Sequence, residues 1–186
     1  RYFFYIGGND SMDTVAKLTE YLKTSDWDMR VIGVPKTIDN DLAGTDHTPG
    51  YGSAAKYIAA TLSEIIRDCA VYTVKAVTIV EIMGRDAGWL TSAAGLMRLN
   101  GMAAPDYIYL PEVPFSFDAF LEDVTAALEK HPNVVIAVSE GVRDENGRYA
   151  GEGAQSGAAD VFGHKYLSGI GKYLEQLVRD TFGCKV

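Results

Sequence analysis

Short apolar runs alternate with amphipathic stretches along the chain of 186 residues. The runs are rich in β-branched and aromatic side chains and are bounded by Gly, Pro or charged residues, which is typical of β-strands. Between the runs, apolar residues return every three or four positions, which predicts α-helices. The predicted strands are Tyr2–Ile6, Met29–Val34, Ala76–Ile82, Tyr107–Leu110 and Val134–Val138. The predicted helices are Ser11–Lys23, Ser53–Cys69, Trp89–Leu99, Phe117–Lys130 and Lys165–Thr181.

The order of these elements predicts an α/β fold. Strands that are apolar throughout and alternate with helices favour Rossmann-like parallel sheets, with helices on both faces, over an antiparallel sandwich. The stretch "GTDHTPGYGS" lacks periodicity and can serve as a crossing between domains. We therefore expect parts of two similar domains, residues 1–48 and residues 49–186. The chain begins inside a predicted strand and stops just after a predicted helix, so we expect it to be truncated at both ends.

Composition and charge narrow the class of protein. The formal charge of −8 leaves no surplus of Lys and Arg for a phosphate backbone, so we expect no nucleic-acid partner. No apolar run approaches the length that spans a membrane, so we expect no membrane partner. The two cysteines, Cys69 and Cys184, form no CxxC pair and indicate neither a zinc site nor a disulfide framework. We expect a globular protein of the cytoplasm.

Polar segments follow the predicted strands, at the sheet edge where ligands of such folds collect. They are GGNDS, PKTIDND, MGRDAG, PE and SEGV. In GGNDS, Gly8 lets the backbone approach a ligand, and the start of the next helix favours an anion such as phosphate. Asp10 would repel that anion unless a cation such as Lys36 lies opposite. The alternative is a tight turn in which Asp10 or Ser11 caps the helix.

The segment PKTIDND combines a lysine with two aspartates. An extended backbone would turn Thr37, Asp39 and Asp41 toward one side, because side chains alternate along a strand. One carboxylate can then accept a proton from a substrate hydroxyl while the other holds Mg²⁺ or orients its neighbour. Lys36 can neutralise a phosphoryl group in transfer. The alternative is a cluster of Asx-turns in a solvated loop.

Two further segments carry candidate binding residues. Arg85, in MGRDAG, can bind a phosphate with two hydrogen bonds, or it can form an ordinary salt bridge with Glu81 or Asp86. Glu140, in SEGV, can accept hydrogen bonds from sugar hydroxyls, or it can be a solvated charge at the end of a strand. Neither residue decides between these alternatives alone.

Taken together and in this order, GGNDS, PKTIDND, MGRDAGW, PE and SEG resemble the phosphofructokinase family along nearly the whole chain. The resemblance implies transfer of a phosphoryl group to the 1-hydroxyl of fructose 6-phosphate, with Mg²⁺ as cofactor. It implies that Asp39 is the proton acceptor and that Thr37 and Asp41 bind the sugar phosphate and support the metal region. It also implies a donor-binding domain before residue 48 and a sugar-phosphate domain after it, in a homo-oligomer (dimer or tetramer). Four positions match sugar-phosphate contacts of the family: Met83, Gly84, Arg85 and Glu140.

Two positions bear on the phosphoryl donor. Family members that use ATP typically carry GGDGS and PGTIDND, whereas those that use pyrophosphate resemble GGDDS and PKTID. Here Asp10 would fill the space of a nucleotide's α-phosphate, and Lys36 would stabilise the charge on a short inorganic donor. The resemblance therefore favours pyrophosphate as donor, in a reaction that runs both ways. The catalytic candidates are Asp39, Lys36 and Asp10, and the donor-binding candidates are Gly8, Asn9 and Ser11.

Two other functions stay open at this point. One is an ATP-dependent 6-phosphofructokinase of the same fold. The other is a catalytically silent subunit that binds a sugar phosphate and regulates an active enzyme. The intact TIDND sequence favours catalysis, because a binding protein has no need of a paired acid in that loop.

The chain departs from the family pattern in three places. Asn9 stands where most members have a metal-binding aspartate; its amide oxygen can still ligate Mg²⁺, but with less charge. Ala76, next to Lys75, stands where an arginine usually reaches the sugar phosphate of a neighbouring subunit. The family's N-terminal glycine-rich donor loop and its C-terminal basic residues have no counterpart in this chain.

Overall fold

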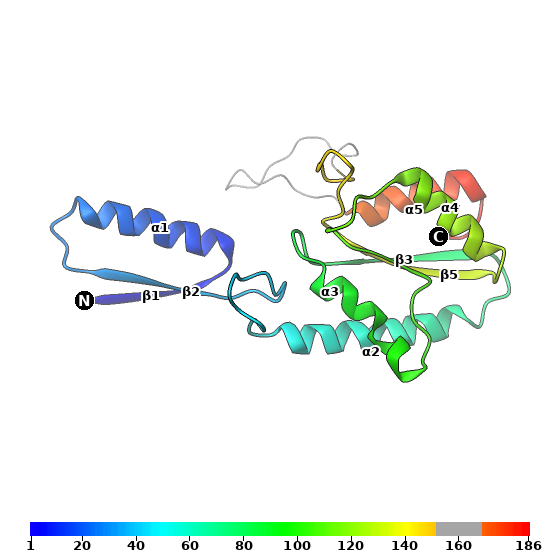
Figure 1. The fold of residues 1–186 in the computed structure, drawn as a ribbon, viewed down its shortest axis with the longest axis horizontal. Helices are drawn as coiled ribbons and strands as arrows, with labels where there is room; N and C mark the ends of the chain where they lie inside the picture. The colour runs from blue at the N-terminus through cyan, green and yellow to red at the C-terminus, as the bar shows by residue number, and fades with distance from the viewer. Residues whose placement is uncertain (152–168) are drawn as a thin grey trace. The chain divides into compact units, whose positions relative to one another are not determined.

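The structure is a computed structural model that describes residues 1–151 and 169–186 and, at position 100, only the backbone. The chain forms two compact units, Arg1–Gly52 and Ser53–Val186 (Figure 1). The division falls inside the Gly-rich stretch 44–53. Every pair of strands in both units is parallel, so the predicted parallel α/β class is confirmed for the described residues.

The first unit is a strand–helix–strand arrangement. Strand β1 (Tyr2–Gly7) pairs in parallel with β2 (Arg30–Pro35), and helix α1 (Asn9–Lys23) connects them. Helix α1 covers one face of this two-stranded sheet (Figure 1). It lies close to the sheet because Met12 occupies the space above Gly33, where a side chain would collide with its sulfur atom at 2.9 Å.

The opposite face of this small sheet is apolar and exposed. Tyr2, Phe4 and Ile6 alternate along β1 and are 65%, 61% and 67% exposed. On β2, the register partners of Phe4 and Ile6 are Ile32 and Val34, which are also exposed. Within residues 1–52, all of which the structure describes, no apolar side chain is buried, so this unit has no hydrophobic core of its own.

The second unit contains a three-stranded parallel sheet in the order β3-β5-β4. In Figure 1, helices α4 and α5 lie on one side of this sheet and α2 and α3 on the other. The central strand, β5, therefore has helices over both faces. The elements are α2 (Tyr51–Cys69), β3 (Ala76–Ile82), α3 (Trp89–Ser92), η1 (Ala93–Asn100), β4 (Tyr107–Tyr109), α4 (Phe117–Leu128), β5 (Asn133–Ser139) and α5 (Ile170–Phe182).

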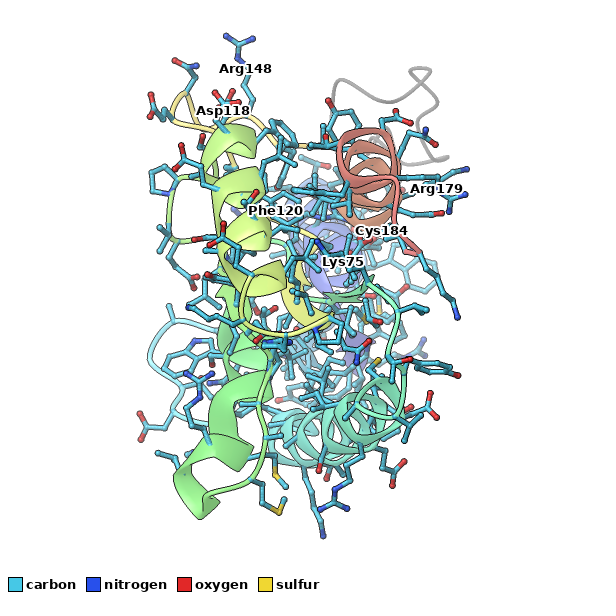
Figure 2. All side chains as sticks on the ribbon, turned by 90° about the vertical axis from the view of Figure 1, so that its right-hand side faces the viewer. Lys75, Asp118, Phe120, Arg148, Arg179 and Cys184 are labelled. Atoms are coloured by element: carbon cyan, nitrogen blue, oxygen red, sulfur yellow. The ribbon has the colours of Figure 1, made fainter. Side chains whose placement is uncertain are left out.

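A hydrophobic core fills the space between this sheet and the helices α4 and α5. Phe120 of α4 and Leu174 of α5 are fully buried against β5, which is itself buried from Val134 to Ser139. Figure 2 shows Phe120 turned toward the interior, whereas Arg179 points outward from α5. This core fixes the positions of the carboxyl ends of the strands.

The sequence predicts most element boundaries to within a few residues, with one error. The predicted helix Trp89–Leu99 is α-helical only to Ser92 and then tightens to a 3₁₀-helix. This 3₁₀ segment packs closely on β4, because Gly95 leaves room for Ile108, whose Cδ1 would lie 3.3 Å from an added Cβ. The predicted start at Lys165 lies outside the described residues, and α5 is described from Ile170.

Two helices end at residues that are typical of such positions. Ser116 caps α4, because its hydroxyl accepts a hydrogen bond from the Ala119 N–H. Gly183 ends α5 in the left-handed conformation, with φ of 60°. None of the helices described is both long and apolar enough to span a membrane.

Candidate active site

In the first unit, the GGNDS segment forms the turn from β1 into α1. The helix begins at Asn9, and the residue before it, Gly8, has no side chain to cap it. The alternative in which Asp10 or Ser11 caps the helix is therefore wrong, because both residues lie inside its first turn. A carboxylate in this turn interacts favourably with the positive end of the helix dipole. Asp10 thus has a structural role in α1, whatever it does for a ligand.

The loops after β1 and β2 lie side by side. The Lys36 N–H donates a hydrogen bond of 2.8 Å to the Gly7 carbonyl, and the Lys36 carbonyl oxygen lies 3.9 Å from where a Cβ of Gly8 would be. This follows from the parallel register, in which Gly7 is paired with Pro35. The structure therefore brings GGNDS and PKTIDND together at one edge of the sheet. That the Lys36 ammonium offsets the Asp10 carboxylate stays a prediction.

The TIDND loop is bent and not extended, so the expectation of an extended backbone is wrong. The Asp39 N–H donates a hydrogen bond of 3.0 Å to the Thr37 hydroxyl, which folds the chain back after two residues. Asn40 then adopts φ of 61°, in the left-handed region. Lys36 and Asp41 are exposed, whereas Thr37 and Asp39 are half-buried.

Asn40 is a residue that the sequence analysis did not single out. Its Nδ2 donates a hydrogen bond of 3.1 Å to the Asp46 carbonyl, and its Oδ1 accepts one of 2.9 Å from the Thr48 N–H. Both Asn40 and Thr48 are buried. The available signal was its position between two aspartates, since Asn is one of the few residues that tolerates the left-handed conformation.

In the second unit, the end of β5 holds the MGR segment that follows β3. The Ser139 hydroxyl donates a hydrogen bond of 2.7 Å to the Gly84 carbonyl. The Gly84 N–H donates one of 3.2 Å to Glu140 Oε1. Glu140 is therefore not a solvated strand-end charge; it is half-buried and fixes the backbone of MGR.

The backbones of two loops come into direct contact at Gly141. A Cβ added there would lie 1.8 Å from the Arg85 carbonyl oxygen, so only glycine allows this approach. The Gly141 N–H also donates a hydrogen bond of 3.1 Å to the Ser139 hydroxyl. Ser139 therefore connects the backbones of both loops through one buried oxygen.

The PE segment after β4 contacts the same loop. Glu112 Oε1 accepts a hydrogen bond of 2.7 Å from the Gly88 N–H. Segments that follow all three strands of the sheet thus meet at residues 84–88. The segments PE and SEGV were expected near a ligand, but no role was predicted for Glu112 or Ser139. A polar residue directly after an apolar strand was the signal that could have identified both.

The salt-bridge alternative for Arg85 finds no support among the described residues. Asp86 pairs with Arg143, and Glu81 Oε2 accepts a hydrogen bond of 3.0 Å from the Gly171 N–H. Both carboxylates are therefore engaged elsewhere. Arg85 itself is exposed beside the loop contact that Gly141 allows.

Asp86 belongs to a small polar cluster at the rim of this site. The Arg143 guanidinium lies over the Tyr149 ring, 4.3 Å from its centroid, and donates a hydrogen bond of 2.8 Å to the Tyr149 oxygen. The Tyr149 hydroxyl donates to Asp86 Oδ1 at 3.3 Å. Burial, and then the Asp86 carboxylate, raise the pKa of the Tyr149 hydroxyl above its usual value, so it stays protonated.

Ala76, which stands where an arginine usually reaches a neighbouring subunit, lies away from these loops. Ala76 begins β3, and Met83 follows its other end. Val77, next to Ala76, donates its N–H to the Lys185 carbonyl at 2.9 Å, and Figure 2 labels Lys75 beside the C-terminal segment. Lys75 is exposed at this amino edge of the sheet.

A ready-made metal cage does not occur in the described part of the chain. No three His, Cys, Asp or Glu side chains there cluster as ligands would. Asn9, the predicted metal ligand, is exposed at the start of α1.

The fold and these loops define an α/β protein whose candidate binding residues follow the carboxyl ends of parallel strands. More particularly, the chain belongs to the phosphofructokinase family, because the family model described as Phosphofructokinase matches residues 1–186. The family resemblance found in the sequence is confirmed.

Relatives and solved structures agree with this assignment. The chain is 45% identical over 188 residues to the pyrophosphate--fructose 6-phosphate 1-phosphotransferase of Xanthomonas campestris, covering 100% of this chain and 44% of that protein. It is 37% identical to a sulfofructose kinase of Alkalicoccus urumqiensis, covering 95% of this chain and 44% of that protein. The pyrophosphate-dependent phosphofructokinase structure from Nitrosospira multiformis matches with a TM-score of 0.73 and 35% identity, over 99% of this chain and 42% of that chain. The chain therefore spans less than half the length of these proteins.

Proposed function

We propose that the chain is part of a phosphotransferase that moves a phosphoryl group from pyrophosphate to the 1-hydroxyl of fructose 6-phosphate. The products are fructose 1,6-bisphosphate and phosphate, and the reaction runs both ways in glycolysis and gluconeogenesis. The observation that carries this proposal is the adjacency of two loops: the Lys36 backbone lies against Gly7 and Gly8, beside the first turn that contains Asp10. Because the relatives are longer, the activity is proposed for a complete protein of their length.

The two units would divide the substrates. The first unit would bind pyrophosphate through the turn into α1, where backbone N–H groups favour an anion. Asp10 would occupy the space that a nucleotide needs, and Lys36 would supply the compensating positive charge. The donor-binding residues in this proposal are Gly8, Asn9 and Ser11.

Asp39 would accept the proton of the sugar 1-hydroxyl as that oxygen attacks the phosphoryl group. Lys36 would stabilise the charge on the group in transfer, and Thr37 and Asp41 would hold the surrounding loop and substrate. Most of the acceleration would come from positioning and charge stabilisation, as is usual for phosphoryl transfer.

The second unit would bind the acceptor sugar phosphate. Arg85 is exposed and therefore accessible to a phosphate, which a guanidinium can bind with two parallel hydrogen bonds. Met83 and Gly84 would contact the sugar. Glu140 would serve it both directly and by fixing the Gly84 N–H.

Mg²⁺ is compatible with the residues of the first unit. This ion usually binds through one or two carboxylates and the phosphates of the substrate, so a complete protein cage is not expected. Asn9 would hold it, with carboxylates from the adjoining TIDND loop. The ion would neutralise charge on the pyrophosphate oxygens.

A donor assay on the complete protein tests the proposal. We expect turnover of fructose 6-phosphate with pyrophosphate and little with ATP; the reverse result would identify the ATP-dependent alternative. Substrate binding without turnover from either donor would identify the silent regulatory subunit. Sulfofructose belongs among the acceptors assayed, because one relative is named for it.

The assignment of pyrophosphate as the phosphoryl donor can be tested separately. Replacing both residues, Asp10→Gly with Lys36→Gly, removes the proposed nucleotide mimic and its compensating charge. We expect the double variant to lose pyrophosphate-dependent turnover. Unchanged use of pyrophosphate would contradict the assignment of these two residues.

The remaining proposals concern assembly and location. We propose a homo-oligomer, either a dimer or a tetramer, in the cytoplasm. Light scattering of the complete protein would measure its mass in solution, and a monomer would contradict the first part.

A further inference from the structure

Asn40 has a backbone conformation that is uncommon for residues other than glycine. Its φ of 61° lies in the left-handed region. Among residues 1–151 and 169–186, Asn40 is the only non-glycine residue with positive φ. Such conformations persist only where the surrounding structure enforces them, and they concentrate at functional sites. Asn40 lies between Asp39 and Asp41, the two carboxylates of the loop.

The side chain of Asn40 supplies what holds this conformation. Its amide group donates to the Asp46 carbonyl at 3.1 Å and accepts from the Thr48 N–H at 2.9 Å, so it joins the loop to chain six and eight residues further on. Asparagine offers a donor and an acceptor on one short side chain and also tolerates the left-handed region. Aspartate lacks the donor when ionised, and glycine lacks both groups.

The burial pattern of the first unit shows how much depends on this anchor. Within residues 1–52, all described, the buried residues are Gly7, Asn40 and Thr48. No apolar side chain is buried there. The loop that carries Asp39 is therefore held in this unit mainly by buried polar contacts, with no fully buried apolar side chain to support it.

We infer that Asn40 is a positioning residue for phosphoryl transfer: its buried amide fixes the backbone that presents Asp39 and Asp41. This inference rests on the proposed function. It assigns Asn40 no contact with substrate; the side chain acts through the two aspartates that flank it. A misplacement of a reacting group by about 1 Å can cost on the order of 100-fold in rate.

The test compares two variants of the complete protein with fructose 6-phosphate and pyrophosphate. Asn40→Ala removes both hydrogen bonds and disfavours the left-handed backbone. Asn40→Gly removes both hydrogen bonds but keeps that backbone accessible. We expect kcat per folded enzyme to fall on the order of 100-fold for Asn40→Ala and on the order of 10-fold for Asn40→Gly, with KM for both substrates nearly unchanged.

Gly44→Ala is the matched control in the same loop. Gly44 has φ of 71°, and an added Cβ there meets no atom within 4 Å, so alanine strains the backbone while both hydrogen-bonding groups of Asn40 stay in place. We expect Gly44→Ala to lower thermal stability and leave kcat close to wild type. A fall in kcat equal to that of Asn40→Ala would mean that any loop strain suffices, and would overturn the inference.

The remaining outcomes separate the inference from the function beneath it. If wild-type protein turns over and both Asn40 variants keep wild-type kcat per folded molecule, the inference is wrong and the proposed function stands. If the variants raise KM and leave kcat intact, Asn40 serves binding and the positioning role is likewise wrong. If the wild-type protein transfers no phosphoryl group to any acceptor, the proposed function fails and takes the inference with it.

Discussion

The two units hold their candidate site loops by different means. In the second unit, Ser139 and Glu140 fix the Gly84 backbone from the end of β5, a strand buried along most of its length. In the first unit, Asn40 anchors the TIDND loop, while the strands of that unit bury no apolar side chain. The same arrangement of loops after parallel strands therefore has a packed support in one unit and a polar support in the other.

The energies of these supports differ. Burying a Val, Leu or Phe side chain stabilises a fold by about 1.5–3 kcal/mol, whereas a typical hydrogen bond contributes a net 0.5–1.5 kcal/mol. The second unit has many such buried side chains, including Phe120, Leu174 and Val178. The MGR loop of the second unit should therefore be rigid, and the TIDND loop of the first unit should depend on a few polar groups.

The largest predicted effect is at Asp39, in the unit proposed to carry the chemistry. Asp39→Ser in the complete protein should lower kcat by about 10²–10⁴-fold, the usual contribution of a general base, with a modest change in KM. Steady-state kinetics with pyrophosphate measures this. Asp13→Ser is the control, because Asp13 is an exposed carboxylate of the same unit that pairs only with Lys17 among the described residues. Near-normal turnover of Asp39→Ser would refute the base assignment.

The second prediction concerns the stability of the two sheets in the 186-residue chain. Backbone amides of β1 and β2 should exchange with solvent faster than those of β3 and β5, by about 100-fold or more, because local opening is easier where few apolar contacts are lost. Hydrogen exchange followed by mass spectrometry or NMR measures the difference. Equal protection in the two sheets would mean that the bare face of β1 does not weaken its unit, and the comparison would fail.

The third prediction concerns the backbone contact at Gly141. Gly141→Ala would place a methyl group 1.8 Å from the Arg85 carbonyl oxygen, so one of the two loops must move. We expect the free energy of unfolding to fall by about 2–3 kcal/mol. We also expect a higher KM for fructose 6-phosphate, with less effect on the KM for pyrophosphate.

Gly52→Ala provides the matched control for Gly141→Ala. Gly52 lies in α2, where an added Cβ meets nothing within 4 Å. Alanine there should leave the stability unchanged or raise it by less than about 0.5 kcal/mol, because Gly52 lies in the first turn of α2 and not in its interior. Urea denaturation measures both variants, and a Gly141→Ala protein as stable as wild type would contradict the close approach of the two loops.

The sequence predicted the fold class well, because strand and helix periodicity is a local signal. The predicted strand Ala76–Ile82 matches β3 at both ends, and the predicted helix that begins at Phe117 matches the start of α4. The family resemblance likewise rested on short segments that can be read directly from the sequence.

The parts that the sequence did not predict depend on contacts between distant residues. The bend at Asn40 depends on backbone groups six and eight residues away, and the role of Ser139 depends on Gly84, 55 residues earlier. The tightening after Ser92 depends on packing against Ile108. Local periodicity carries no information about contacts between residues that are far apart in sequence, so the pattern of residue types could not reveal them.

The smallest predicted effect is at Asp86, on the rim of the packed unit. Its pair with Arg143 is partly exposed, and such pairs typically contribute about 0.2–1 kcal/mol, because water and salt screen them. Arg143 keeps its contact with the Tyr149 ring when the carboxylate is removed. Asp86→Asn should therefore lower the free energy of unfolding by less than about 1 kcal/mol, far less than Gly141→Ala does. It should also lower the pKa of Tyr149, since the Asp86 charge is the second cause, after burial, that raises this pKa. Urea denaturation and an absorbance titration of the tyrosine measure the two effects. If Asp86→Asn destabilises the protein as much as Gly141→Ala does, polar contacts and not packing support the MGR loop, and the contrast between the two units is lost.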